Sequence, residues 1–327
     1  MTNFMDEIKQ SISNKKVKIV LPEGTDERVL KAARKLQEEG IVTPLLIGAK
    51  ELVEVAANQA GINLDGIEIV DPVQYEQLEE LIEKFVERRN GKATHAQARI
   101  QLKDVNTFGT MLVYTGYADG LVSGAAHTTA ETVRPALQII KTKPGVSKTS
   151  GAFIMVRGEE RLVFADCAIT IAPTSEDLAE IAVESAKTAK AFGMEPKVAM
   201  LSFSTKGSAV SPETKKVEEA TKLAQEKSPG LQIDGEFQFD AAYVPEIAGK
   251  KAPGSPIQGD ANVFVFPSLE AGNIGYKLTE RLGGFEALGP ILQGLNMPVN
   301  DLSRGCSADD VYKLVLMTAA QSMMSGE

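Results

Sequence analysis

The 327-residue sequence has little of what several classes of protein require. Its two cysteines, Cys167 and Cys306, and its two histidines, His95 and His127, do not follow any metal-ligand spacing. Neither a zinc site nor a disulfide framework is therefore expected, and we expect no metal. No apolar run is long enough to cross a membrane, and the acidic N-terminus lacks the apolar core of a signal peptide. These absences favour a cytoplasmic protein with reduced thiols and no membrane partner.

Excess positive charge is also missing. The formal net charge is -9 and no basic run occurs, so a nucleic-acid partner is not expected, because phosphate backbones are bound by clustered lysines and arginines. Hydrophobic residues make up 43% and charged residues 24% of the chain, which are ordinary values for a globular protein. The length suffices for two α/β domains or one large one.

Strand-like and helix-like segments alternate along the first part of the chain. Short β-branched runs lie between amphipathic stretches, a pattern typical of a mostly parallel sheet with helices on both faces. We predict strands at 17–21, 43–48, 67–70 and 120–124, and helices at 5–13, 25–40, 50–60, 74–89, from 94 onward, again through 109–113 after a passage at 104–106, and from 128 onward.

A polar segment at 141–150, broken by Pro144 and Gly145, indicates a linker to a second unit. Beyond it the pattern predicts a hairpin, then further strand and helix segments. We predict strands at 151–156, 161–165, 198–202, 237–242 and 263–267, helices at 174–192, 269–282, 307–324 and from 211 onward, and an apolar segment at 289–297.

The turn after residues 120–124 is a candidate anion site. Small residues follow the expected strand, and Thr128 with Glu131 forms the pattern of a capping box that opens a helix. A strand, a small-residue turn and a helix N-terminus together make a suitable cradle for an anion. The pattern of a Walker loop is absent.

The densest chemistry lies at 300–310. Ser303 and Arg304 place a hydroxyl donor beside a fixed positive charge, and Gly305 allows close approach of the backbone. Ser307 and Asp310 also have the spacing of a helix cap. The segment alone leaves the catalytic and the capping interpretation equally open.

Other candidate residues favour structural interpretations when considered one by one. Spacing suggests that Arg134 is a surface arginine, and that Arg88 and Arg89 stabilise the end of a helix. His127 in a capping turn is more often structural than catalytic. Cys167 follows a strand without a neighbouring cation or helix start that would lower its pKa, so a buried thiol is favoured.

Taken together, three motifs resemble those of the phosphate acetyltransferase (phosphotransacetylase) family, and the resemblance covers essentially the whole chain. They are 301–307 (DLSRGCS), 123–135 (SGAAHTTAETVRP) and 164–168 (FADCA). The resemblance implies reversible conversion of acetyl-CoA and phosphate to CoA and acetyl phosphate, without a metal or other cofactor. Phosphate butyryltransferase, or another short-chain phosphate acyltransferase, is the alternative activity.

The resemblance also implies a fold, an assembly and a set of site residues. The fold would be α/β, with two domains of mostly parallel sheet and a cleft between them, as in isocitrate and isopropylmalate dehydrogenases. Residues 1–145 with 300–327 would form the first domain and residues 146–299 the second, and the chain would be a homodimer. CoA, phosphate and acetyl phosphate would be its partners.

Residues carried over from the family receive specific roles. Ser303, Arg304 and Asp310 would be catalytic. Asp310 would take the thiol proton of CoA, Ser303 would stabilise the carbonyl oxygen, and Arg304 with Arg134 would hold phosphate. A carboxylate at a helix N-terminus is a weak base, so Asp310 requires partial burial for this role. The expected substrate-binding residues are Arg134, Arg89, Ser123, Gly124, His127, Thr128, Thr129 and Cys167; Arg88 is the alternative to Arg89, which we prefer.

Rival functions are disfavoured by the residues. A non-catalytic CoA or phosphate sensor would not need Ser303, Arg304 and Asp310. A dinucleotide-dependent dehydrogenase would need a GxGxxG pattern after a strand, and the sequence has none.

Overall fold

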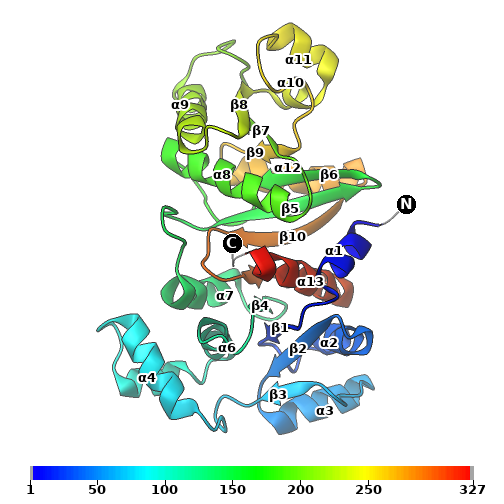
Figure 1. Ribbon diagram of the computed structural model, residues 1–327, viewed down its shortest axis with the longest axis vertical. Helices are drawn as coiled ribbons and strands as arrows, with labels where there is room; N and C mark the ends of the chain where they lie inside the picture. Colours follow the sequence, from blue (N-terminus) through cyan, green and yellow to red (C-terminus); the bar gives the residue numbers. More distant parts are fainter. Residues whose placement is uncertain (1–2, 325–327) are drawn as a thin grey trace. The chain divides into compact units, whose positions relative to one another are not determined.

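The computed structural model describes residues 3–324 and divides into two units, which are coloured along the chain in Figure 1. Unit 1 runs to Thr142 and resumes at Leu295, and unit 2 comprises Lys143–Gly294. These divisions lie a few residues before those expected from the sequence, at 145/146 and 299/300. An isolated bridge between Thr142 and Leu295, and bonds from the Asn296 amide to the carbonyls of residues 140–142, tie both crossing segments to unit 1.

The sheet of unit 1 has five strands, all parallel, where the sequence pattern predicted a mostly parallel sheet. Their order is β11-β4-β1-β2-β3. The strands are β1 (Val17–Leu21), β2 (Val42–Ile47), β3 (Glu68–Val70), β4 (Gly120–Ser123) and β11 (Val299–Asp301). Strand β11 was not predicted, because three residues that include Asn300 and Asp301 carry no strand pattern. It forms because its register places Asn300 opposite Val122 and Asp301 opposite Ser123 on β4.

Helices cover both faces of this sheet. Gly109 of α6 packs against Val20, whereas Gly120 of β4 packs against Ile19 and against Thr318 of α13. Because successive strand residues point to opposite faces, α6 and α13 lie on opposite sides. The helices of unit 1 are α1 (Phe4–Ile12), α2 (Glu27–Glu39), α3 (Lys50–Ala60), α4 (Leu78–Arg89), α5 (His95–Gln101), α6 (Val105–Tyr114), α7 (Thr129–Pro135), the π-helix η1 (Ala136–Ile140) and α13 (Ala308–Met324).

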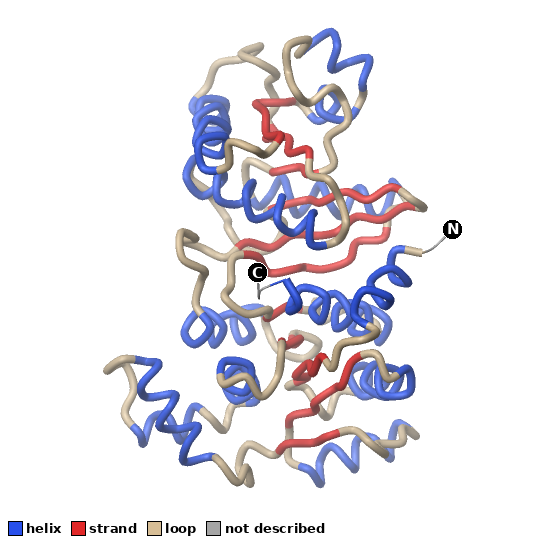
Figure 2. The backbone as a smooth tube through the Cα atoms, viewed as in Figure 1, coloured by secondary structure: helices blue, strands red, loops and turns tan. Residues whose placement is uncertain are grey.

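The six-stranded sheet of unit 2 is mixed, with order β10-β5-β6-β9-β7-β8. The predicted hairpin is confirmed, since β5 and β6 are antiparallel neighbours, and β10 pairs antiparallel with β5. The remaining pairs are parallel. The strands are β5 (Ser150–Arg157), β6 (Glu160–Ala165), β7 (Lys197–Leu201), β8 (Gln232–Phe237), β9 (Val263–Val265) and β10 (Glu286–Gln293), drawn as red tubes in Figure 2.

One strand prediction in unit 2 was wrong. Residues 237–242 do not form a strand: β8 ends at Phe237, and a short helix follows in which Val244 N–H bonds to Asp240. The alternation of Phe237 and Phe239 with polar residues imitated a strand, but Ala241 and Ala242 turn into the aromatic core instead. The helices of unit 2 are α8 (Ser175–Ala191), α9 (Pro212–Lys227), α10 (Phe239–Tyr243), α11 (Pro245–Lys251) and α12 (Leu269–Gly283). Among residues 3–324, no helix combines the length and apolarity needed to cross a bilayer.

Candidate active site

Three loops of unit 1 meet at one edge of its sheet. Strands β11, β4 and β1 are parallel neighbours, so the segments that follow their carboxyl ends lie together. These segments are residues 22–26 after β1, residues 124–128 after β4 and residues 302–307 after β11. The carboxyl ends of parallel strands are the usual location of ligand sites in α/β sheets.

A buried carboxylate organises the loop after β4. Glu23 accepts hydrogen bonds from the backbone N–H groups of Ala125 (2.8 Å), Ala126 (2.7 Å) and His127 (2.8 Å), and it lies 2.8 Å from His127 Nδ1. Gly24 permits this turn, because a Cβ there would lie 2.7 Å from the Ile47 carbonyl oxygen. These backbone N–H groups were expected to cradle an anion, but a protein carboxylate occupies them.

The next N–H groups are occupied in the same way. The Glu131 carboxylate accepts bonds from the Thr128 N–H (2.7 Å) and hydroxyl (2.8 Å), which confirms the predicted capping box at the start of α7. Thr128 and Thr129 are exposed. Gly124 has φ +109°, and a Cβ there would lie 2.5 Å from Asp301 Oδ1, so only glycine fits between the two loops. Because the backbone N–H groups of residues 125–128 already donate to Glu23 and Glu131, the exposed side chains of these loops are the groups that can contact a ligand.

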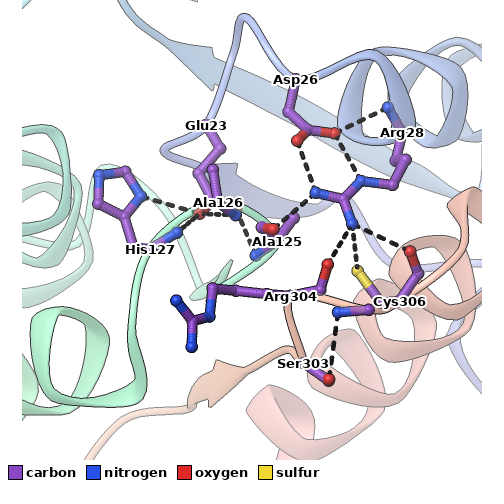
Figure 3. Close-up of polar contacts among 10 residues, drawn as sticks. Glu23, Asp26, Arg28, Ala125, Ala126, His127, Ser303, Arg304 and Cys306 are labelled. Atoms are coloured by element: carbon purple, nitrogen blue, oxygen red, sulfur yellow. Dashed lines mark hydrogen bonds and ion pairs between the residues drawn. The ribbon is translucent and has the colours of Figure 1, made fainter.

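Ser303 and Arg304 are two such side chains. Both are exposed, and no partner is recorded among residues 3–324 for the guanidinium of Arg304. The carbonyl oxygen of Arg304 instead faces Arg28, while its side chain extends away from Arg28 (Figure 3). Ser303 Oγ accepts a 3.3 Å bond from the Gly305 N–H, which leaves its own O–H free to donate.

Asp310 has the geometry of a helix cap. Its carboxylate accepts the Ser307 N–H (2.7 Å) and hydroxyl (2.8 Å), and its own N–H donates to Ser307 Oγ (3.1 Å). The capping interpretation is thus confirmed. Asp310 is exposed, so the partial burial that would strengthen it as a base is not present in this structure.

A buried polar cluster lies beneath the two loops. Asp301 Oδ1, Ser123 Oγ and Thr132 Oγ1 are all buried without a hydrogen-bond partner among the described residues. Burial raises the pKa of Asp301 to about 6, against the lowering effect of the nearby hydroxyls of Thr129 and Thr132. Asp301 is therefore largely ionised at neutral pH while having fewer partners than a buried carboxylate ordinarily has.

The candidate arginines differ in how far they are already engaged. Arg134 is exposed, and no bond to its guanidinium is recorded in the described part of the chain. Arg88 donates to the carbonyls of Ile139 (2.5 Å) and Ile140 (2.9 Å) and lies over the Tyr114 ring, so it closes the end of η1. Arg89 makes one long bond of 3.5 Å to the Gln138 carbonyl, and its buried Nε has no partner within the described range 3–324. Arg89 therefore makes fewer and longer hydrogen bonds than Arg88 does.

Neither cysteine has an activated thiol. Cys167, after β6 in unit 2, is fully buried, and burial together with the charge of Asp166 raises its pKa well above the ordinary value. Burial also raises the pKa of Cys306 to about 11, although Arg28 opposes this. Both remain protonated at neutral pH. Within residues 3–324, no three His, Cys, Asp or Glu side chains are grouped as metal ligands would be.

Sequence reasoning missed three residues at this edge: Glu23, Asp26 and Arg28. Arg28 donates to backbone oxygens in both of the other loops (Figure 3). The available signal was the Pro-Glu-Gly turn that follows the first strand, because such a turn lies at the carboxyl edge of the sheet.

Fold and site together define an α/β protein that presents the Ser303 hydroxyl and the Arg304 guanidinium, without a recorded partner among residues 3–324, at the carboxyl edge of a parallel sheet, a suitable arrangement for an anionic substrate. The family model described as phosphate acetyl/butaryl transferase matches residues 3–319. The chain belongs to this family.

Individual phosphate acetyltransferases are similar to this chain over nearly its full length. The phosphate acetyltransferase of Bacillus subtilis (strain 168) is 65% identical over 323 residues, covering 99% of this chain and 100% of the relative. A phosphotransacetylase structure from Staphylococcus aureus is 62% identical with TM-score 0.93, and one from Streptococcus pyogenes is 56% identical with TM-score 0.95. Each covers 98% of both chains.

Proposed function

We propose that this chain, an acyltransferase, transfers an acetyl group between CoA and phosphate by direct attack in a ternary complex. Phosphate acetyltransferase activity follows from full-length relatedness at more than 60% identity to proteins of that name. The CoA sulfur attacks the acetyl carbon of acetyl phosphate, the carbon–sulfur bond forms, and the bond between that carbon and the bridging oxygen breaks as phosphate leaves. The observation that carries this assignment of the site is that Ser303 and Arg304 are adjacent and exposed, and that the Arg304 guanidinium has no recorded partner among residues 3–324.

Each side chain has a role suited to its chemistry. Arg304 and Arg134 hold the phosphoryl oxygens, because a guanidinium forms paired charge-assisted bonds to phosphate. Ser303 donates its hydroxyl to the carbonyl oxygen, on which negative charge develops during attack. Arg89 binds an anionic group of the substrate. The exposed Thr128 and Thr129, with Ser123, Gly124 and His127, form the adjoining wall.

Asp310 is the proposed base for the CoA thiol, whose ordinary pKa is about 8.5. Its carboxylate accepts two hydrogen bonds from Ser307 and is exposed, so the CoA thiol can reach it. The reaction requires no metal or other cofactor.

Cys167 is proposed to form no acetyl-enzyme, since its thiol is buried and its pKa is raised. A covalent route would exchange label between CoA and acetyl-CoA in the absence of phosphate. We expect no such exchange, and we expect Cys167→Ala to retain turnover. Exchange that disappears in the variant would establish the covalent route instead.

The active form is proposed to be a homodimer that works in the cytoplasm. Ile274, Leu278 and Leu282 are spaced four residues apart on α12 and are 57%, 53% and 82% exposed, so one face of the helix presents a stripe of large apolar side chains to solvent. Such a stripe is typical of a protein contact. Light scattering should give a mass twice that of the chain, and Leu278→Lys should reduce the measured mass to that of a single chain.

Units 1 and 2 are proposed to be the two domains of the protein, with a fold of the isocitrate and isopropylmalate dehydrogenase type. Each unit has its own sheet, and unit 2 has a hydrophobic core cluster of its own. Limited proteolysis that cuts first near the crossings at 142/143 and 294/295 would support this division.

Thioester absorbance tests the activity. Purified protein is mixed with CoA and acetyl phosphate in the presence of a metal chelator, and butyryl phosphate serves as the comparison substrate. A rapid rise with acetyl phosphate is expected. Faster transfer from butyryl phosphate would assign the chain to the butyryl branch of the family, and no rise with either substrate would favour a binding protein.

A further inference from the structure

Arg28 lies at the centre of the three loops without being one of the proposed substrate-binding residues. Its guanidinium has five N–H groups, and five oxygen acceptors surround it. Asp26 accepts from Nε (3.0 Å) and from one terminal nitrogen (2.8 Å), which also donates to the Ala125 carbonyl (2.6 Å). The other terminal nitrogen donates to the carbonyls of Arg304 (2.7 Å) and Cys306 (3.1 Å). No donor is left for a substrate anion.

The acceptors belong to all three loops. Asp26 precedes α2, Ala125 belongs to the loop after β4, and Arg304 and Cys306 belong to the loop after β11 (Figure 3). A single guanidinium therefore joins the backbone of the catalytic segment to the neighbouring loop. The planar fork of arginine suits this task, because its donors diverge at fixed angles.

The charge of Arg28 is held in place. Asp26 raises the pKa of Arg28 above its ordinary value, and although burial raises the pKa of Asp26, the bonds from Arg28 keep it below its ordinary value. Asp26 also caps α2 by accepting the Arg28 N–H (2.9 Å), so the pair is fixed to a helix.

Glu23 complements Arg28 from the same turn. The N–H of Ala125 donates to Glu23 (2.8 Å) while its carbonyl accepts from Arg28 (2.6 Å), so both polar groups of one residue are fixed by residues 22–28. The turn after β1 thus secures the other two loops, with an anion for the N–H groups and a cation for the carbonyls.

We propose that Arg28 is a positioning residue for the reaction: it fixes the Ser303–Arg304 backbone against the loop after β4 and does not contact substrate. This inference rests on the proposed function, because Ser303 and Arg304 supply the chemistry. Loss of Arg28 should therefore reduce turnover by misplacing these groups, and a displacement of about 1 Å can cost on the order of 100-fold in rate.

Arg34 offers a matched control on the same helix. It pairs with Glu38 (2.8 Å) and donates to the carbonyls of Asn63 (3.3 Å) and Asp65 (3.0 Å), so it too ties a loop to α2. Its side chain is 23% exposed, against 29% for Arg28. Its loop lies before β3, at the opposite edge of the sheet from the proposed site.

The experiment compares kcat and KM of Arg28→Ala, Arg28→Lys and Arg34→Ala with those of the unmodified protein, after circular dichroism has shown that each variant is folded. Arg28→Ala should lower kcat by about 10- to 100-fold and change KM for CoA and acetyl phosphate by less than about threefold. Arg28→Lys should be intermediate, because an ammonium retains the charge but lacks the fork. Arg34→Ala should keep its kcat.

Other outcomes overturn the inference in distinguishable ways. Unchanged kcat in folded Arg28→Ala would show that the loops need no such tie, and a raised KM with unchanged kcat would make Arg28 a substrate-binding residue. If Arg28→Ala does not fold, full turnover in Arg28→Lys refutes the need for the fork. Equal loss of kcat in Arg34→Ala would reduce the effect to general stability. An inactive unmodified protein would instead contradict the proposed function itself.

Discussion

Asp301 should impose a specific pH dependence on the stability of unit 1. Its residue is only 2% exposed, and burial raises the pKa of its carboxyl from the ordinary value of 3.8 to about 6. The folded state therefore binds this proton more tightly than the unfolded state does. The resulting stabilisation is complete below 3.8 and is lost as the pH rises through about 6.

The magnitude follows from the size of the shift. One pKa unit corresponds to about 1.4 kcal/mol, so the full loss is roughly 3 kcal/mol, of which about 1.4 kcal/mol falls between pH 5 and pH 8. Asp301→Asn carries no charge at any pH. The free energy of unfolding of the unmodified protein, minus that of the variant, should therefore fall by about this amount over that interval.

Urea unfolding of both proteins at pH 5, 6, 7 and 8 measures this difference, and hydrogen exchange of the β4 and β11 amides assigns it to unit 1. Asp309 provides the control, because its exposed carboxylate pairs with Lys313 and that bond lowers its pKa. Asp309→Asn should not reproduce the loss toward high pH. Parallel pH profiles for the unmodified protein and Asp301→Asn would refute the argument that Asp301 is buried with too few partners.

Three further predictions concern the proposed site. Asp310→Asn should lower kcat by about 100-fold or more with little change in KM, as loss of a general base does. Asp309→Asn, one position earlier, should leave kcat unchanged. Near-normal kcat in Asp310→Asn would leave Asp310 only its capping role. Arg304→Ala should raise KM for acetyl phosphate and lower kcat together, and unchanged steady-state kinetics would discard the clamp. Arg89→Ala should lower kcat/KM at a nearly constant melting temperature. Arg88→Ala should lower the melting temperature, because two carbonyls of η1 lose their hydrogen bonds. The reverse pattern would exchange the roles of the two arginines.

Periodicity and end signals predicted most of the elements. The bounds of β1 and α3 match the prediction, and the capping box at Ser307 and Asp310 forms as its spacing indicated. These features depend on residues close together in the sequence, which a pattern can represent. The failures at 237–242 and at β11 occurred where contacts with distant residues outweighed the local pattern.

The contrast between local sequence patterns and contacts with distant residues also explains which parts of the site were predictable. Residues that carry the proposed chemistry, such as Ser303 and Arg304, stand out by type and by position in a turn. The residues that support them do not stand out: Arg28 lies 276 positions before Arg304, and only its place just after the Pro-Glu-Gly turn distinguishes it from Arg34 on the same helix. Strand order decides the matter, because β4 lies between β1 and β11 and brings three remote loops to one edge. The strand order places Arg28 beside the loops of the proposed site and Arg34 beside the loop before β3. The difference in kcat between Arg28→Ala and Arg34→Ala therefore tests a consequence of the sheet topology.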